Sequence, residues 1–307
     1  MFDHLKKLSE NRKFDPWEAK QSIAEIKVLL HCSRYWMLSE WECENMSFPF
    51  WRLYHSSTGG SFITYNKIEY ELNNTKLVLI PPYTSFSTHI KQHSVTEEES
   101  IIGEVIKTTT EVDYFKEKGM CDQLFVHFSL GFPYDKIKIG IYEIELNDYW
   151  LHQINLIKIN RLEFPNNINT HSAIEINCLI MYALQGITLE HWDFPVIDKR
   201  ILKVISFIDK NIDKELTNNV LSKIANLATN SFARLFKLSL NCTVKNYIQQ
   251  RRIEHAIMIL HHSNKDIEDI ALECGYYDRH HFSKVFKQQT GIPPAKYRLK
   301  IEYKNDI

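Results

Sequence analysis

The stretch Ile270–Arg298 reads IALECGYYDRHHFSKVFKQQTGIPPAKYR and has the layout of two short helices joined by a tight turn. Ala271 is a small residue suited to close packing in the first helix, and Gly275 permits the positive φ that the turn needs. Asp278 stands at the expected N-cap of the second helix. The i, i+3, i+4 spacing predicts one buried stripe on that helix, made of Phe282, Val285 and Phe286.

The opposite face of this second helix carries the polar residues Arg279, His280, His281 and Lys284. Because residues three or four positions apart are neighbours on a helix, these side chains share a face. Arg and Lys donate hydrogen bonds to guanine in the major groove, and His can donate or accept at base edges. The pattern is therefore typical of a helix-turn-helix that reads DNA.

The same unit occurs once more, 50 residues earlier: residues 232–237 read FARLFK where residues 282–287 read FSKVFK. In this first copy Ser222 is the small residue expected to pack closely in the first helix. Ala228 stands where Asp278 caps the second copy, which weakens the helix start by about 1 kcal/mol. In the first copy Asn230 can pair with adenine, but Ala233 can offer only a methyl contact to a base. The second copy is therefore predicted to carry more of the sequence discrimination. The outward residues of the first copy are Asn230, Ser231, Ala233 and Arg234.

The quoted stretch resembles the signature of the AraC/XylS family of bacterial transcription regulators, and the resemblance extends from Lys199 to Lys300. It implies an all-helical DNA-binding domain, residues 196–307, in which two helix-turn-helix units flank one linker helix and enter successive major-groove segments. A linker of about 17 residues, from Val244 to Leu260, spans roughly 25 Å. That length is comparable to the ~34 Å between adjacent major grooves on one DNA face.

The resemblance also implies which residues bind DNA. Base contacts fall on the outward faces of both units, and basic residues beside them contact phosphates, which position the protein without specifying sequence. The predicted DNA-binding set is Asn230, Ser231, Arg234, Lys237, Arg279, His280, His281, Lys284, Lys287, Lys296 and Arg298.

Charge is divided unevenly along the chain. From Lys199 onward there are 19 Lys+Arg against 11 Asp+Glu, whereas the first 198 residues hold 18 against 27. A basic C-terminal third predicts that this part meets a polyanion. The six cysteines form no Cys-x-x-Cys pair, and no secretory or membrane-spanning segment is expected. The predicted location is the bacterial cytoplasm, at the nucleoid.

The front half shows a different pattern. A helix is predicted over residues 16–30, followed by short β-branched and aromatic runs separated by turn residues, which favour an antiparallel sandwich or barrel. Residues 68–89 resemble the strand–turn–strand of a cupin-like β-barrel, so the predicted class is α+β with two domains. Residues 1–150 are predicted to form a cupin-like effector-sensing domain with flanking helices. Residues 151–195 are predicted to be a helical segment that serves dimerisation and links the domains, or that packs on the barrel. The predicted strands are 50–54, 61–65, 68–72, 77–80, 123–128 and 137–144.

A barrel of this kind in AraC-type proteins binds a small effector. Aromatic and polar groups on the strands suit a sugar, through stacking and hydrogen bonds, or an aromatic acid, through an arginine. The cupin-enzyme pattern of a close His-x-His pair is absent around His89, His93 and His127, so neither a metal nor another cofactor is predicted. The candidate effector-binding residues are Trp51, Arg52, Tyr54, Tyr65, His89 and His127.

The sequence thus predicts a non-enzymatic, dimeric, effector-responsive transcription regulator, an activator, whose partners are operator or promoter DNA, a small effector such as a sugar, and RNA polymerase. Three alternatives stay open at this point. One is a DNA binder without an effector. The others are a cupin enzyme, or an alkyltransferase, fused to a DNA-binding module; the alkyltransferase would need a zinc-held cysteine cluster.

Overall fold

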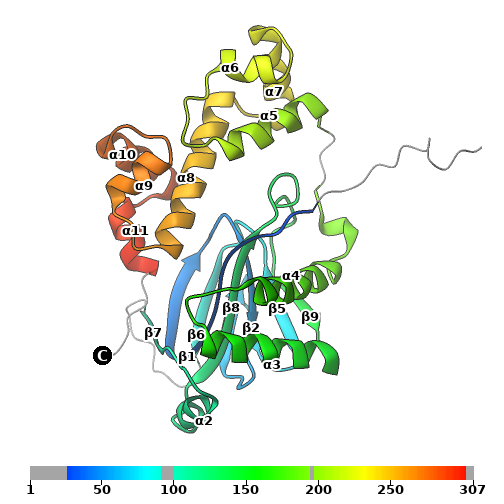
Figure 1. The fold of residues 1–307 in the computed structure, drawn as a ribbon, viewed down its shortest axis with the longest axis vertical. Helices are drawn as coiled ribbons and strands as arrows, with labels where there is room; N and C mark the ends of the chain where they lie inside the picture. The colour runs from blue at the N-terminus through cyan, green and yellow to red at the C-terminus, as the bar shows by residue number, and fades with distance from the viewer. Residues whose placement is uncertain (1–25, 91–99, 194–196, 302–307) are drawn as a thin grey trace, which may run out of the picture.

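The structure, a computed structural model, describes residues 26–90, 100–193 and 197–301. An antiparallel sheet with covering helices comes first, and every element in the described part after residue 197 is a helix (Figure 1). The predicted α+β class is confirmed. The strands are β1 (Leu29–Met46), β2 (Trp51–His55), β3 (Ser61–Tyr65), β4 (Ile68–Leu72), β5 (Lys76–Ile80), β6 (Phe86–Ile90), β7 (Ser100–Glu104), β8 (Cys121–Ser129) and β9 (Tyr142–Glu145).

The sheet is a half-barrel with strand order β4-β3-β6-β1-β8-β2-β5-β9, and β7 also pairs with β1. The 18-residue strand β1 organises it, because it pairs antiparallel with β6, β7 and β8. Most of the helix predicted over residues 16–30 lies outside the described residues. Its end was wrong: Leu30 belongs to β1 and pairs with Phe128, since cross-strand pairing overrides the local helical spacing. The strand predicted over 137–144 begins later, at Tyr142.

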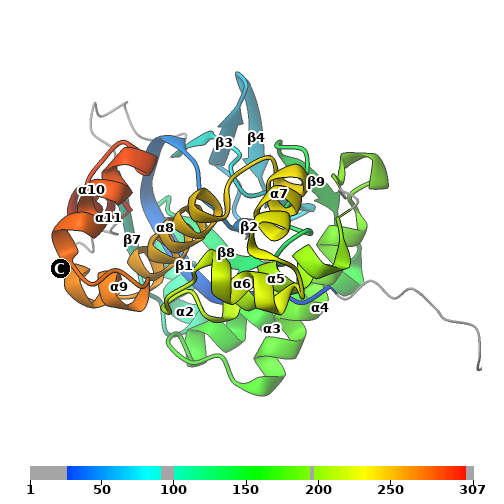
Figure 2. The same cartoon turned by 90° about the horizontal axis from the view of Figure 1, so that it is seen from above.

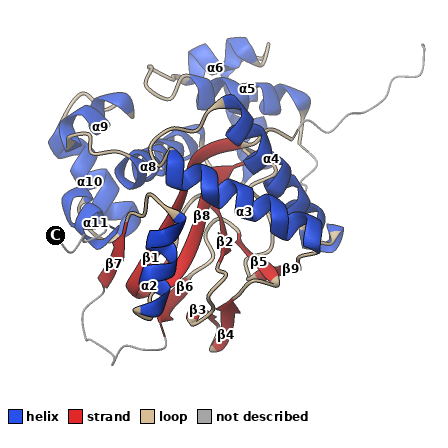
Figure 3. Ribbon diagram, turned by 60° about the horizontal axis from the view of Figure 1, so that its bottom comes forward, coloured by secondary structure: helices blue, strands red, loops and turns tan. Residues whose placement is uncertain are grey.

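Two long helices lie across one face of the sheet (Figure 3). Trp51 and Phe128 stack at 5.8 Å between ring centroids, and Ile154 and Ile180 are fully buried in the same cluster. The segment predicted to serve dimerisation or packing on the barrel therefore packs on the sheet. The elements between β7 and residue 193 include α2 (Thr109–Glu117), α3 (Asp148–Glu163), α4 (Thr170–Gln185) and the 3-10 helix η1 (Leu189–His191).

A buried ion pair fixes α3 to the sheet. Lys158 Nζ lies 2.6 Å from Asp122 Oδ2, and the side chains are 5% and 0% exposed. The same carboxylate accepts hydrogen bonds from the Tyr35 hydroxyl and from the backbone N–H groups of Ser57 and Thr58. Burial opposes ionisation of Asp122, but Lys158 and these donors outweigh it and hold the pKa of the carboxyl well below its usual range.

The other face of the sheet meets the C-terminal helices. Buried residues of the sheet, such as Tyr54, share one core with residues of α8 to α10, such as Ile257 and Phe282. Figure 2 shows α8 running between the α9–α11 group and the α5–α7 group. These helices are α5 (Lys199–Lys210), α6 (Asn218–Ile224), α7 (Thr229–Leu240), α8 (Val244–His262), α9 (Ile267–Glu273), α10 (Arg279–Thr290) and α11 (Pro294–Ile301).

The length and apolar character of the helices show whether one of them could cross a membrane. Within the described residues, none combines the length and the apolar character needed to cross a bilayer.

Candidate nucleic-acid interface

The second helix-turn-helix, α9 and α10, has the predicted local structure. Ala271 is buried, and Gly275 has a φ of +73° in the turn between the helices. The Asp278 carboxylate caps α10 by accepting hydrogen bonds from the backbone N–H groups of His280 and His281, each at 3.0 Å. Three predictions are thereby confirmed: the small packing residue, the glycine turn and the acidic cap. The buried stripe of α10 is Phe282, Val285 and Phe286, as predicted.

Burial of that stripe turns the polar side of α10 to solvent. The rings of Phe282 and Phe286 pack edge to face at 5.6 Å, so the orientation of the helix is fixed by its core. Every residue predicted to read bases from this helix is exposed. They are His280, His281 and Lys284. Arg279 and Lys287, which are also predicted to bind DNA, are exposed as well.

The first helix-turn-helix, α6 and α7, is the less regular copy. Ala228 provides no side-chain cap for α7, as predicted. The turn is made differently from that of the second unit: Asn226 adopts a φ of +53°, since Asn tolerates the left-handed conformation that Gly275 takes freely. Ser222 is buried in the small position, as predicted. The exposed residues of α7 include Asn230, Ser231, Arg234 and Lys237, whereas Ala233 is half-buried.

The linker helix α8 joins the two units and has 19 residues, two more than predicted. At 1.5 Å per residue it is about 28 Å long, which approaches the ~34 Å between adjacent major grooves on one face of DNA. Its N-terminal residues Val244 and Ile248 belong to the core of the first unit. Ala256 and Leu260, further along, belong to the core of the second. One helix therefore sets the spacing of both recognition helices.

Arg252 of α8 braces the two units, and sequence reasoning missed it. Its Nε donates to the Ile212 carbonyl at 3.1 Å and its Nη2 to the Lys214 carbonyl at 2.7 Å, both in the loop before α6. The same guanidinium lies over the ring of Tyr276, in the turn of the second unit. The two turns that Arg252 contacts are distant from it in the sequence. No local sequence pattern could therefore have indicated this role.

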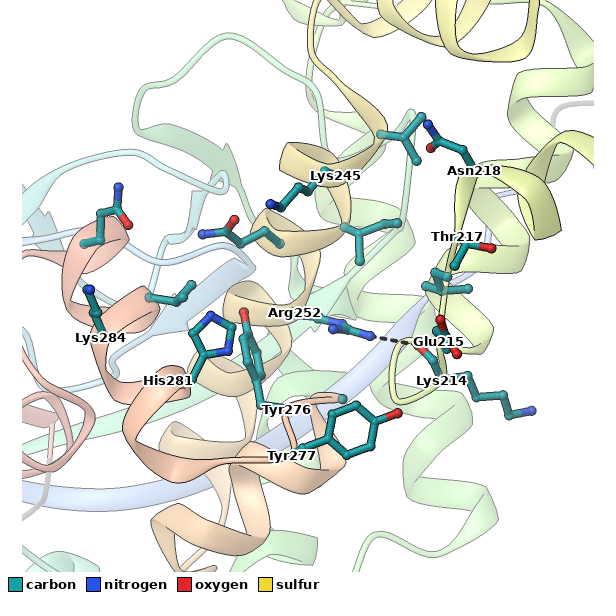
Figure 4. Close-up of a pocket in the computed structure, with 17 residues that line it drawn as sticks. Lys214, Glu215, Thr217, Asn218, Lys245, Arg252, Tyr276, Tyr277, His281 and Lys284 are labelled. Carbon is teal, nitrogen blue, oxygen red and sulfur yellow. Dashed lines mark hydrogen bonds between the residues drawn. The ribbon is translucent and has the colours of Figure 1, made fainter. Parts of the chain in front are cut away.

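An open groove of about 660 Å³ lies between the two units along α8. Figure 4 shows its basic side chains, which come from both units and from α8 itself. A groove with cations on both walls is suited to a polyanion. Two of these cations, Lys214 and Lys245, were missed from the sequence, because the loop and helix that carry them meet only in the folded chain. The charged groove residues include Lys214, Glu215, Lys245, Arg252 and Lys284.

The remaining predicted phosphate contacts lie on α11. Lys296 is exposed. Arg298 is half-buried and donates a hydrogen bond to the Lys265 carbonyl, so part of its guanidinium supports the α8–α9 loop.

The six predicted effector residues are not all brought together. Trp51 points into the core under α3 and α4, and its Nε1 donates to Asp135 at 2.9 Å. Arg52, the next residue, lies on the opposite face, because successive side chains of a strand alternate. Tyr65 ends β3, and His89 stacks on Phe62 at 5.0 Å on the β3–β6 pair. Three of the six do share one place, the contact between the sheet and α8: Arg52, Tyr54 and His127.

Arg52 is the centre of this contact. Its Nη1 donates to the Tyr54 hydroxyl and its Nη2 to His261 Nε2, each at 2.7 Å, and it lies over the Phe48 ring. Among the described residues no carboxylate pairs with it, and its buried Nε has no partner. Sequence reasoning missed His261 on α8, which closes this contact.

Burial keeps the nearby imidazoles uncharged. It lowers the pKa of His262 to about 4, and Arg34 and Arg52 add to that effect. The pKa values of His127 and His261 are held well below the usual value by burial first and by Arg52 next. At neutral pH these rings are therefore neutral, which leaves each with one lone pair on a ring nitrogen.

Comparisons with known proteins find one matching family model and several similar proteins. A family model described as a helix-turn-helix domain matches residues 221–300. Regulatory protein SoxS of Escherichia coli (strain K12) is 33% identical over 103 residues, covering 34% of this chain and 96% of SoxS. The lactose operon transcription activator of Staphylococcus xylosus is 28% identical over 145 residues, covering 47% of this chain and 52% of the activator.

This chain therefore spans about half the length of that activator. A solved structure of ToxT from Vibrio cholerae O395 is similar over 88% of this chain and 97% of its own, at 11% identity and a TM-score of 0.47.

Proposed function

Because the chain belongs to the AraC/XylS family of transcription regulators, we propose that it binds specific DNA sequences and activates transcription in response to a small effector. The observation that carries the proposal is the placement of two exposed polar faces, on α7 and α10, on helix-turn-helix units joined by one linker helix. Similarity to a lactose operon transcription activator supports activation, and it supports a sugar as the effector class.

The proposed readout is unequal. In the second unit His280, His281 and Lys284 read base edges, since a capped helix presents them on one solvent face. In the first unit Asn230 and Arg234 contribute from a helix without a side-chain cap. The proposed phosphate contacts are Lys237, Lys287, Lys296 and the free part of Arg298, together with Ser231 and Arg279. The proposed partners are operator or promoter DNA, a second copy of the chain and RNA polymerase, in the bacterial cytoplasm.

Lys284→Ala tests the readout. We expect a loss of about 1–3 kcal/mol in binding to a site selected from random-sequence DNA, and a smaller loss on unselected DNA, because a base contact contributes to the specific site alone. Fluorescence anisotropy with both DNAs at one fixed salt concentration measures the two losses.

Two variants control this measurement. Lys203→Ala removes an exposed cation from α5 and should leave the ratio of the two affinities unchanged. Arg234→Ala should lower that ratio less than Lys284→Ala does. Equal losses of Lys284→Ala on both DNAs would make Lys284 a phosphate contact, and no selected site at all would contradict sequence-specific binding.

The effector is proposed to bind at the sheet, at the contact of Arg52 and Tyr54 with α8. A ligand that binds the native state raises stability by about 2.7 kcal/mol at one hundred times its Kd. We therefore expect a rise in melting temperature with at least one sugar in a panel of sugars and small aromatic acids, and a smaller rise in Arg52→Met. A shift with acids alone would replace the sugar by a carboxylate ligand. No shift with any compound would favour a regulator without an effector.

A further inference from the structure

The contact between the sheet and α8 contains a cluster of one thiol and two imidazoles. Cys32 on β1 and His127 on β8 are paired across adjacent strands, and His262 is the last residue of α8. One possible ligand atom from each of the three lies within 4.8 Å of the others. Cys32 and His127 are 9% and 2% exposed, so two of the three donors lie in the protein interior.

The hydrogen bonds of this cluster leave a buried lone pair. His262 Nδ1 is 2.9 Å from the Met258 carbonyl, which can only accept, so the proton of this neutral ring is on Nδ1. His262 Nε2 is then an acceptor, and the His127 Nδ1–H donates to it at 3.1 Å. The proton of His127 is thereby placed on Nδ1. Its buried Nε2 is a bare lone pair, and it has no hydrogen-bond partner.

We propose that Cys32, His127 and His262 bind one transition-metal ion of the zinc class, with a water molecule as fourth ligand. One thiolate and two neutral imidazoles are donors that such an ion prefers. In a tetrahedral site with Zn–N bonds of about 2.1 Å, neighbouring ligand atoms are roughly 3.4–3.6 Å apart. The candidate ligand atoms lie within 4.8 Å of one another, so binding requires a contraction of about 1 Å and breaks the His127–His262 hydrogen bond.

The surroundings support ligation. The Met258 carbonyl orients the His262 ring, as partners of metal-bound histidines commonly do. Burial raises the pKa of the Cys32 thiol to about 11, which is more than Arg34, a hydrogen bond with the His127 backbone and Arg52 together lower it. An ion would supply the charge compensation that burial of the thiolate requires.

The ligands come from both halves of the chain. Two belong to the sheet and one to the helix that spaces the recognition helices. Metal binding would therefore fasten α8 to the sheet. The consequence for DNA binding rests on the proposed function, whereas the site itself does not.

Metal stoichiometry tests the site in the full-length protein. After chelator treatment, titration with ZnCl₂ in equilibrium dialysis should give one zinc ion per chain in the wild type. Cys32→Ser and His262→Gln should each bind it at least tenfold more weakly. Two matched controls, Cys178→Ser and His152→Gln, change an exposed residue of the same type and should bind zinc like the wild type. No stoichiometric zinc in the wild type, or equal binding by all five proteins, would overturn the proposal.

Cobalt substitution tests ligation by Cys32 in the wild-type protein, without a variant of any ligand. Wild-type protein loaded with Co²⁺ should show a thiolate-to-cobalt charge-transfer band and the intense visible bands of a four-coordinate ion. A weak spectrum without the sulfur band would refute ligation by Cys32, whether or not Cys32→Ser folds.

DNA binding with and without zinc separates the two proposals. A change of several-fold in affinity for a selected site, lost in His262→Gln, would support a regulatory role of the ion. Equal affinities would restrict the site to a structural role. Absence of DNA binding in both forms would contradict the proposed function, while zinc stoichiometry would still decide the site.

Discussion

Gly275→Ala is expected to weaken binding to a selected DNA site by at least tenfold and to lower stability by about 2–4 kcal/mol. Its φ of +73° costs a side chain about 1–2 kcal/mol. An added Cβ would also lie 2.6 Å from Arg252 Nη2 and 2.8 Å from the Ile212 carbonyl oxygen. Arg252 must then move, and the hydrogen bonds that connect the two helix-turn-helix units are lost. Urea unfolding and anisotropy on the same preparation measure both effects.

Gly291→Ala is the matched control for this prediction. Gly291 has a φ of +83°, but no atom lies within 4 Å of an added Cβ. It should show the conformational cost without the displacement of Arg252, and DNA affinity close to that of the wild type. If both variants bound DNA equally well, the Arg252 brace would not determine how the units meet DNA.

Asp122→Ala is expected to destabilise the chain by about 3–5 kcal/mol, because it leaves Lys158 buried without its counter-charge. The hydroxyl of Tyr35 and the backbone N–H groups of Ser57 and Thr58 lose their acceptor as well. Thermal or urea unfolding by far-UV circular dichroism checks the loss. The control is Glu273→Ala, which breaks the exposed pair with Lys265 and should cost less than about 1 kcal/mol.

The same pair predicts a pH dependence. The pKa of Asp122 is lower in the folded chain than in the unfolded one, where it is about 3.9. Its contribution to stability is therefore present above pH ~4 and is lost as the pH falls towards the folded pKa. The unfolding free energy of the wild type should fall more steeply below pH ~4 than that of Asp122→Ala. Parallel curves would mean that Asp122 contributes little.

The helical half could be predicted from sequence because its determinants are local. Gly275 and Asp278 mark a turn and a cap within a few residues, and the aromatic stripe has a helical period. The longest strand, β1, was missed. Its charged residues, such as Glu40 and Glu42, interrupt the apolar pattern. In the sheet they are paired with residues of the neighbouring strand β7. Pairing with three other strands, which a local pattern does not reveal, stabilises it.

The candidate sites divide in the same way. Exposure of His280, His281 and Lys284 follows from helical periodicity alone. The effector residues were less predictable, although strand alternation already implies that Trp51 and Arg52 cannot face one ligand together. Partners of Arg52 and His127 on α8 are more than 130 positions away in the chain, so only the folded structure brings them together.

The placement of α8 has a thermodynamic consequence. This helix contacts the sheet through His261 and His262 and the loop between β5 and β6 through Glu254, and it carries both DNA-facing units. Suppose that a ligand bound at this contact changes the affinity for DNA by some factor. DNA must then change the affinity for that ligand by the same factor, because coupling between two sites is reciprocal. The chain on its operator and the chain free in solution would therefore respond to different ligand concentrations.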